Sequence, residues 1–280
     1  MTVITFAFVV CLGLGGGTQS PVASPSPSPR PVADYQLTTL ELLNAELKAA
    51  AKVYRQGKFA EAEQHARKAL QLNPQNRNAR AYVARTVHAQ FRPGDTTEEN
   101  LAKARQAIEE YKNMLQLSPK DDEAYKAIAY LLGALKESAQ LNAWLMQRAT
   151  DESFEPERRS EAFIVLASRH WDCSYKITEQ SENKVAAIDD NGKSKVTYIM
   201  PKNLSDFQTA MTCVSEGLAE IDHAISLTLD SYTAWSYKYN LLIERSKLSE
   251  MEGKMADKAQ FDKLANEARK QVERLQKTTP

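Results

Sequence analysis

Residues 56–76 read QGKFAEAEQHARKALQLNPQN and decide the fold of this chain. Alanine and leucine recur there at helical spacing, between a glycine that ends one helix and a proline that ends the next. Small alanines let neighbouring helices approach closely, and proline cannot continue a helix because it lacks an N–H. The stretch therefore predicts the second helix of an antiparallel helical pair, which begins after Gly57 and closes at Pro74.

The ending of this stretch recurs further along the chain. LQLNP at residues 70–74 is followed by LQLSP at residues 115–119, one helical pair later and after an enlarged turn at residues 92–94. A third repeat start follows at residues 122–125. Recurrence at this spacing predicts a repeat protein rather than a single helical hairpin.

On these residues the chain resembles the tetratricopeptide repeat proteins, of the exported bacterial type, whose repeats span about 34 residues. The resemblance implies an all-α fold, a right-handed superhelical solenoid of antiparallel helix pairs. The repeat domain is expected to cover residues 35–280 with about five repeats. The expected repeats lie near residues 43–76, 77–121, 122–155, 160–231 and 232–277.

Residues 1–18 are expected to be a signal peptide or an N-terminal apolar segment. Residues 3–14 form an apolar run of the length of a secretory signal, and the glycines at 15–17 provide the small residues of a cleavage site, although no Lys or Arg precedes the run. The expected location is therefore periplasmic or secreted. A membrane-anchored form, lipidated at Cys11, is the alternative.

Residues 19–34 are rich in proline and serine and are expected to form an unstructured linker, because such a segment buries little apolar area. The first helix is then expected to begin at Thr38, where Thr38 and Glu41 have the spacing of a capping box.

The fourth repeat contains an insertion at residues 179–203. Residues 184–188 and 195–200 have the composition of strands, and the Asn-Gly pair within residues 190–193 is typical of a tight hairpin turn. The insertion therefore predicts a small β-hairpin that projects from the helices. A recognition element that offers strand edges to a partner and a decorative loop are both open interpretations of it.

Cys173 and Cys213 flank the insertion, and antiparallel pairing of their two helices brings them close. We therefore expect a disulfide between them in an oxidising compartment. His170 lies three residues before Cys173, so a His-Cys-Cys metal site is a formal alternative. The spacing is not that of a known zinc module, and neither a metal site nor another cofactor is predicted.

The charge balance and the motifs limit the function classes. Lys plus Arg and Asp plus Glu both number 36, so no net charge attracts nucleic acid, and no nucleic-acid partner is expected. The sequence contains no phosphate loop and no nucleophile elbow, so enzymatic activity is not expected. The predicted function is a non-enzymatic scaffold of the bacterial cell envelope that binds a protein or peptide. A membrane-anchored lipoprotein that acts as a structural spacer or self-association unit is the alternative.

The resemblance also implies a binding surface, because the first helices of successive repeats line the concave side in this family. There they hold an extended peptide or a partner helix. Packing between neighbouring repeats is the alternative role of each candidate residue. The candidates at these positions are Tyr54, Arg85, His88, Lys126, Tyr130, Ser168, Trp171 and Asn240.

Overall fold

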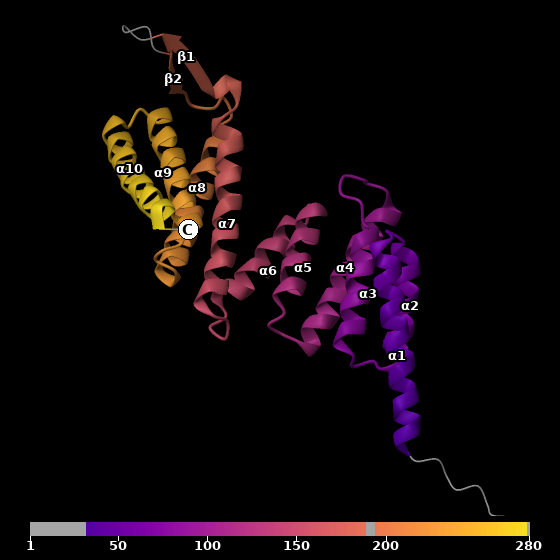
Figure 1. Ribbon diagram of the computed structural model, residues 1–280. Coiled ribbons are helices and arrows are strands. Elements are labelled where there is room, and N and C mark those ends of the chain that lie inside the picture. The colour runs from indigo at the N-terminus through magenta and orange to yellow at the C-terminus, as the bar shows by residue number, and fades with distance from the viewer. Residues whose placement is uncertain (1–31, 189–193, 279–280) are drawn as a thin grey trace, which may run out of the picture.

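The computed structural model describes residues 32–188 and 194–278, and this part of the chain is helical apart from one two-stranded sheet. Ten α-helices in these residues form five antiparallel pairs that stack in sequence order (Figure 1). The pairs are α1 (Val32–Arg55) with α2 (Phe59–Leu72), α3 (Arg77–Gln90) with α4 (Glu98–Leu117), α5 (Asp122–Ala134) with α6 (Ser138–Thr150), α7 (Pro156–Thr178) with α8 (Leu204–Leu227), and α9 (Tyr232–Met251) with α10 (Met255–Thr278). The fold is an all-α, tetratricopeptide-like solenoid, as predicted.

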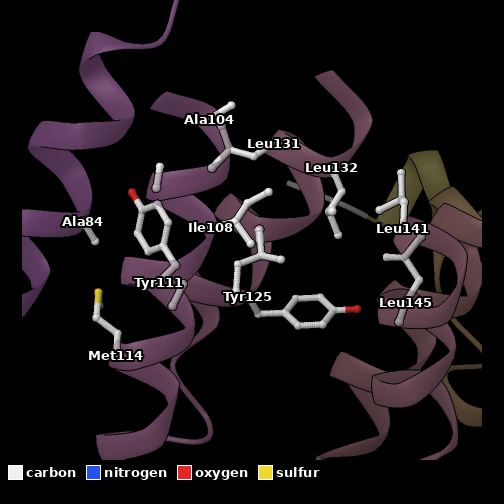
Figure 2. Packing of buried hydrophobic residues seen from close by; sticks show 14 of the residues in the cluster. Ala84, Ala104, Ile108, Tyr111, Met114, Tyr125, Leu131, Leu132, Leu141 and Leu145 are labelled. Carbon is white, nitrogen blue, oxygen red and sulfur yellow. The ribbon is translucent and has the colours of Figure 1, made fainter. Parts of the chain in front are cut away.

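A continuous core runs between the helices. Ala62 and Ala66 of the opening stretch are fully buried, as the close approach of neighbouring helices requires. Figure 2 shows how buried side chains of α3, α4, α5 and α6 gather in the space between these helices, with Ile108 and Tyr125 near its centre. Each repeat therefore shares its core with the next, and no pair of helices buries its apolar face alone.

Repeats one, three and five end their first helix with the same turn. An N–H group bonds back to the carbonyl five residues earlier, and the residue before that N–H has a positive φ. The three hydrogen bonds join Lys58 to Val53 (3.1 Å), Glu137 to Leu132 (3.0 Å) and Lys254 to Ser249 (2.9 Å). The positive φ belongs to Gly57 (75°), Lys136 (59°) and Gly253 (71°). Glycine adopts this conformation without strain, whereas lysine does not.

A second recurring turn begins the next repeat. At three helix starts, a side-chain oxygen at the N-cap accepts a hydrogen bond from the backbone N–H three residues later. These bonds join Asn76 to Ala79 (2.9 Å), Asp121 to Ala124 (3.0 Å) and Ser231 to Ala234 (3.2 Å). Helix α7 instead has Pro156 in its first turn, where the missing N–H has no helical partner to lose.

Helix α1 begins earlier than expected. It starts at Val32 rather than at Thr38, so residues 32–34 of the expected linker are helical. The last proline before this helix is Pro31, and nothing in the following residues interrupts a helix. The signal segment expected at residues 1–18 and the rest of the linker lie outside the described residues. Among residues 32–188 and 194–278, the helices are either too short or too polar to cross a membrane.

The predicted β-hairpin is confirmed. After a 3₁₀ turn, η1 (Ser181–Asn183), strand β1 (Lys184–Ile188) pairs antiparallel with β2 (Ser194–Tyr198). Lys184 lies opposite Tyr198, and Ala186 lies opposite Val196. The hairpin projects beyond the end of α7 (Figure 1). The expected turn residues 190–193 lie outside the described part of the chain, and β2 ends two residues before its predicted end.

Candidate functional site

The first helices of repeats one to three share a groove of about 610 Å³. Residues three and four apart share a helix face, so α3 and α5 each direct one such set of side chains into the groove. The residues that line it are Tyr54, Arg85, His88, Ala89, Tyr111, Glu123, Lys126 and Ala127. Four of the predicted binding residues therefore lie together, namely Tyr54, Arg85, His88 and Lys126.

The cations of this groove are paired with carboxylates of the next repeat. Arg85 of α3 makes a bidentate ion pair with Glu123 of α5. Lys126 lies 2.9 Å from Asp122 in its own helix and 3.2 Å from Glu161 of α7. The side chains of Arg85 and Glu123 are 42% and 48% exposed, and exposed ion pairs contribute little to stability. A charged partner can therefore exchange into the Arg85–Glu123 pair at low cost.

An aromatic cluster adjoins the ion pairs. The His88 ring lies 5.7 Å from both Tyr111 and Tyr130, and its Nδ1 is 3.2 Å from the Tyr111 hydroxyl. Burial lowers the pKa of His88, so the ring is neutral at neutral pH. Tyr130 is 52% exposed and lies at the solvent side of this cluster. The cluster thus offers an aromatic surface next to two cationic side chains, Arg85 and Lys126.

A second groove, of about 550 Å³, continues the first along α5, α7 and α9. Lys126 lines both grooves, so they form one surface, which we call the inner surface. Glu161 and Val165 of α7 contribute to it, and Val165 is 42% exposed. Neither was predicted, because the resemblance placed the binding positions of α7 at Ser168 and Trp171, which lie further along the same helix.

Four of the predicted residues line neither groove, namely Tyr130, Ser168, Trp171 and Asn240. Trp171 is half-buried, with its ring 5.1 Å from Tyr175 and 6.1 Å from Tyr237 of α9. The later part of α7 is therefore covered by α9, and Trp171 packs between these helices. Asn240 is half-buried within α9, and the Ser168 hydroxyl donates to the Val165 carbonyl (2.7 Å).

Cys173 of α7 and Cys213 of α8 form a disulfide, with their Cα atoms 6.2 Å apart. It joins the two long helices near the base of the insertion. Both sulfurs are used by this bond, and His170 lies between Glu216 and Glu220 of α8. The alternative of a metal held by His170 and the two cysteines therefore does not fit the structure. The described residues contain no group of three His, Cys, Asp or Glu side chains arranged to hold a metal ion.

A polar network fixes the base of the hairpin. Glu179, which follows α7, accepts hydrogen bonds from Tyr198 (2.8 Å), Lys184 (2.9 Å) and Lys247 of α9 (2.7 Å). Burial alone would raise the pKa of Glu179, but these three hydrogen bonds lower it to about 2. The two strands are therefore held to both α7 and α9 by one ionised carboxylate.

The network continues into the interior through Glu244 of α9, which is 1% exposed. Lys247 donates to one of its carboxylate oxygens (2.6 Å), and Ser174 and Thr178 of α7 donate to the other (3.0 and 2.7 Å). A buried carboxylate is tolerated only when it is paired and hydrogen-bonded, and Glu244 is both. Sequence reasoning missed this network because its members lie far apart along the chain.

Comparison with known proteins gives likenesses of fold. No protein-family model matches the chain, and no curated protein matches it in sequence. Among solved structures, MamA from Desulfovibrio magneticus is 11% identical with a TM-score of 0.39, over 85% of this chain and 97% of that chain. PilF from Pseudomonas aeruginosa is 15% identical with a TM-score of 0.38, over 85% and 90% of the two chains. A tetratricopeptide repeat protein from Parabacteroides merdae is 14% identical with a TM-score of 0.36, over 84% and 93%.

TM-scores below 0.5 at such low identity establish neither a family nor a function. The assignment of a repeat architecture therefore rests on the helix pairs, the shared core and the recurring turns of the chain itself.

Proposed function

We propose that this protein is a non-enzymatic scaffold that binds a protein partner on its inner surface. The observation that carries the proposal is the position of Lys126, which lines both grooves and so joins the first helices of the first four repeats and the start of α9 into one path. A path that crosses the first helices of several repeats suits an extended peptide or a partner helix better than a compact small molecule.

The chemistry of the path indicates what it would hold. His88 and Tyr130 offer an aromatic surface on which an apolar or aromatic side chain can pack. Arg85 and Lys126 flank it, and two of their carboxylate partners, Glu123 and Glu161, are exposed enough to be replaced. A peptide with an apolar residue close to carboxylates therefore matches the surface, because a bidentate Arg–carboxylate pair adds geometric specificity.

We also propose that the protein works outside the cytoplasm, in the bacterial cell envelope or secreted. The pairing of Cys173 with Cys213 supports this location, since such bonds persist in oxidising compartments. The apolar run at residues 3–14 supports it independently.

Site-specific photo-crosslinking tests the proposed surface. A photoreactive amino acid would replace Val165 on the inner surface or Tyr130 at its edge, where the Tyr130 ring lies 5.7 Å from His88. Lys112 on α4, which is exposed, lines neither groove and contacts no residue of this aromatic cluster, is the control. In cells that produce the protein, we expect the two inner positions to crosslink to the same partner and the Lys112 position not to do so. Equal crosslinking from all three positions, or crosslinking only from Lys112, would remove the proposal.

A further inference from the structure

A groove of about 890 Å³, which we call the outer groove, lies between α6 and α8 with α7 as its floor. Phe163 and Leu166 of α7 line it, whereas Glu161 and Val165 of the same helix line the inner surface. At 3.6 residues per turn these two sets lie on opposite faces of α7. The outer groove is therefore a separate surface, and the proposed function does not use it.

Short side chains keep this groove open. Its walls present the exposed Ala143 of α6 and Ala219 of α8, which leave the space above α7 unfilled. In the first two repeats, by contrast, a side-chain bridge joins the second helices. Arg67 of α2 donates a hydrogen bond of 3.0 Å to Glu110 of α4. No such bridge is found between α6 and α8 in the described residues, so a partner side chain can enter there.

The groove has the length of a short helix. Its floor runs along α7 from Arg159 to His170, which corresponds to about 16 Å, or three helical turns. Phe163 and Leu166 lie at the bottom of the middle section, only 7% and 2% exposed, and the His223 ring stacks on Phe163 at 5.3 Å. Met146 of α6 and Leu227 of α8 line the walls beside them. Met146 is 38% exposed although it is a large apolar side chain. The middle of the groove therefore favours apolar side chains of a helical partner.

The two ends of the groove present different charged groups. At one end, His170 lies between Glu220 (Nδ1 to Oε2, 2.8 Å) and Glu216 (Nε2 to Oε2, 3.2 Å), so two carboxylates face a single imidazole. The Glu216 side chain is 58% exposed and accessible to a further cation. At the other end, Arg159 donates to the carbonyl of Ala149 (3.2 Å) and carries a positive charge. An occupant with one basic and one acidic end matches this pattern.

We propose that the outer groove binds an amphipathic α-helix of a partner protein. That helix has about three turns and places apolar side chains against Met146, Leu227 and the His223 ring above Phe163. It carries a Lys or Arg against Glu216 and an Asp or Glu near Arg159. This is the helix-in-groove mode of recognition, in which apolar side chains spaced three and four apart provide the anchors.

Defined peptides test this proposal with the full chain. The probe is a helix-stabilised peptide of about 12 residues with leucine at three positions of one face, Lys at one end and Glu at the other. One comparison peptide has serine in place of the three leucines, and another has Glu at both ends. Affinity is measured by fluorescence anisotropy. We expect the leucine peptide with Lys and Glu ends to bind about tenfold or more tightly than either comparison peptide.

Protein variants locate the binding. Ala219→Trp and Ala143→Trp fill the groove from opposite walls, whereas Ala259→Trp introduces the same side chain at an exposed position of α10 outside it. We expect about a tenfold loss of affinity in each groove variant and no change in the α10 control. Glu216→Lys should reverse the preference, so that the peptide with two Glu ends binds more tightly. These substitutions are at exposed positions, and circular dichroism checks that the helices are retained.

Three results would overturn the proposal: no binding of the leucine peptide, equal binding of the serine peptide, or unchanged affinity in both groove variants. Sedimentation velocity of the chain alone tests whether a second copy of this chain occupies the groove. Self-association that Ala219→Trp abolishes would assign the groove to a second copy of this chain and would also overturn the proposal.

Discussion

Lys247 of α9 donates a hydrogen bond of 2.7 Å to Glu179, the residue that follows α7 and precedes the hairpin. The same ammonium group donates to Glu244 (2.6 Å) and lies 5.0 Å from the centre of the Tyr198 ring. One cation therefore joins the last repeat, the end of α7 and the second strand of the hairpin. These contacts hold the base of the hairpin in a defined orientation.

Replacing Lys247 should lower the free energy of unfolding. Lys247→Met leaves Glu244 buried without its counter-ion, and loss of one partner from a buried ion pair typically costs about 3 kcal/mol or more. We expect urea denaturation to show a loss of this size. Adding Glu244→Gln to the Lys247→Met variant removes the uncompensated charge and should recover part of the lost stability. A loss below about 1 kcal/mol for Lys247→Met would show that the network is not structural.

Lys136→Gly should stabilise the protein. Lys136 has a φ of 59° at a turn where Gly57 and Gly253 occupy the matching positions of repeats one and five. A non-glycine residue in this region is strained by about 1 kcal/mol, which glycine relieves. The free energy of unfolding should rise by about this amount. Gly57→Ala is the matched control and should lower it by a similar amount, and a fall for Lys136→Gly would contradict the interpretation.

The Cys173–Cys213 disulfide should contribute strongly to stability. For a sequence separation of 40 residues, the chain-entropy model gives about 4 kcal/mol. Urea denaturation of the wild type should therefore shift to lower denaturant when a reductant is added. A variant with serine at both positions should be less stable than the oxidised wild type and insensitive to reductant. Identical curves for the wild type with and without reductant would contradict this prediction.

The pKa values of two histidines should be shifted in opposite directions from the ordinary value. The hydrogen bond to Glu220 raises the pKa of His170, whereas burial lowers the pKa of His88. NMR titration of the ring protons should therefore place the His170 pKa above, and the His88 pKa below, the ordinary value of about 6.5. Equal values for the two rings would refute both assignments.

The two shifts affect stability with opposite sign. The contribution of His170 is fully present below its unfolded pKa of about 6.5 and is lost as pH rises through its higher folded pKa. For His88 the unfolded chain binds the proton more tightly, so stability is lost as pH falls below about 6.5. Glu216→Gln with Glu220→Gln should remove only the first dependence, and a variant that still shows it would contradict the assignment to His170.

The repeat architecture could be predicted because its signals are local. Gly57 and Pro74 delimit one helix within a short stretch, and LQLNP and LQLSP mark the same turn twice. The Asn-Gly pair in the insertion indicated the hairpin for the same reason, since a tight turn depends on adjacent residues. Lys136 could not be recognised in this way, because lysine carries no turn signal even where it replaces glycine.

The site could be predicted only in part, because it depends on how distant helices meet. The register carried over from the family selected Tyr54, Arg85, His88 and Lys126, and these four residues line one groove. Trp171 lies outside that groove, with its ring 6.1 Å from Tyr237 of α9, because α7 is long and its later turns meet the last repeat. The Glu179 network and the outer groove join helices that are far apart in sequence, and periodicity contains no information about them.

The most direct test of the central claim compares two matched double variants. Arg85→Ala with Lys126→Ala removes one arginine and one lysine from the inner surface, and Arg105→Ala with Lys112→Ala removes the same pair from the exposed side of α4. The measurement is the affinity of each for the partner that crosslinks to Tyr130. We predict about a tenfold or greater loss for the first variant and no change for the second. Equal affinity of both variants and the wild type would contradict the claim that the inner surface binds the partner.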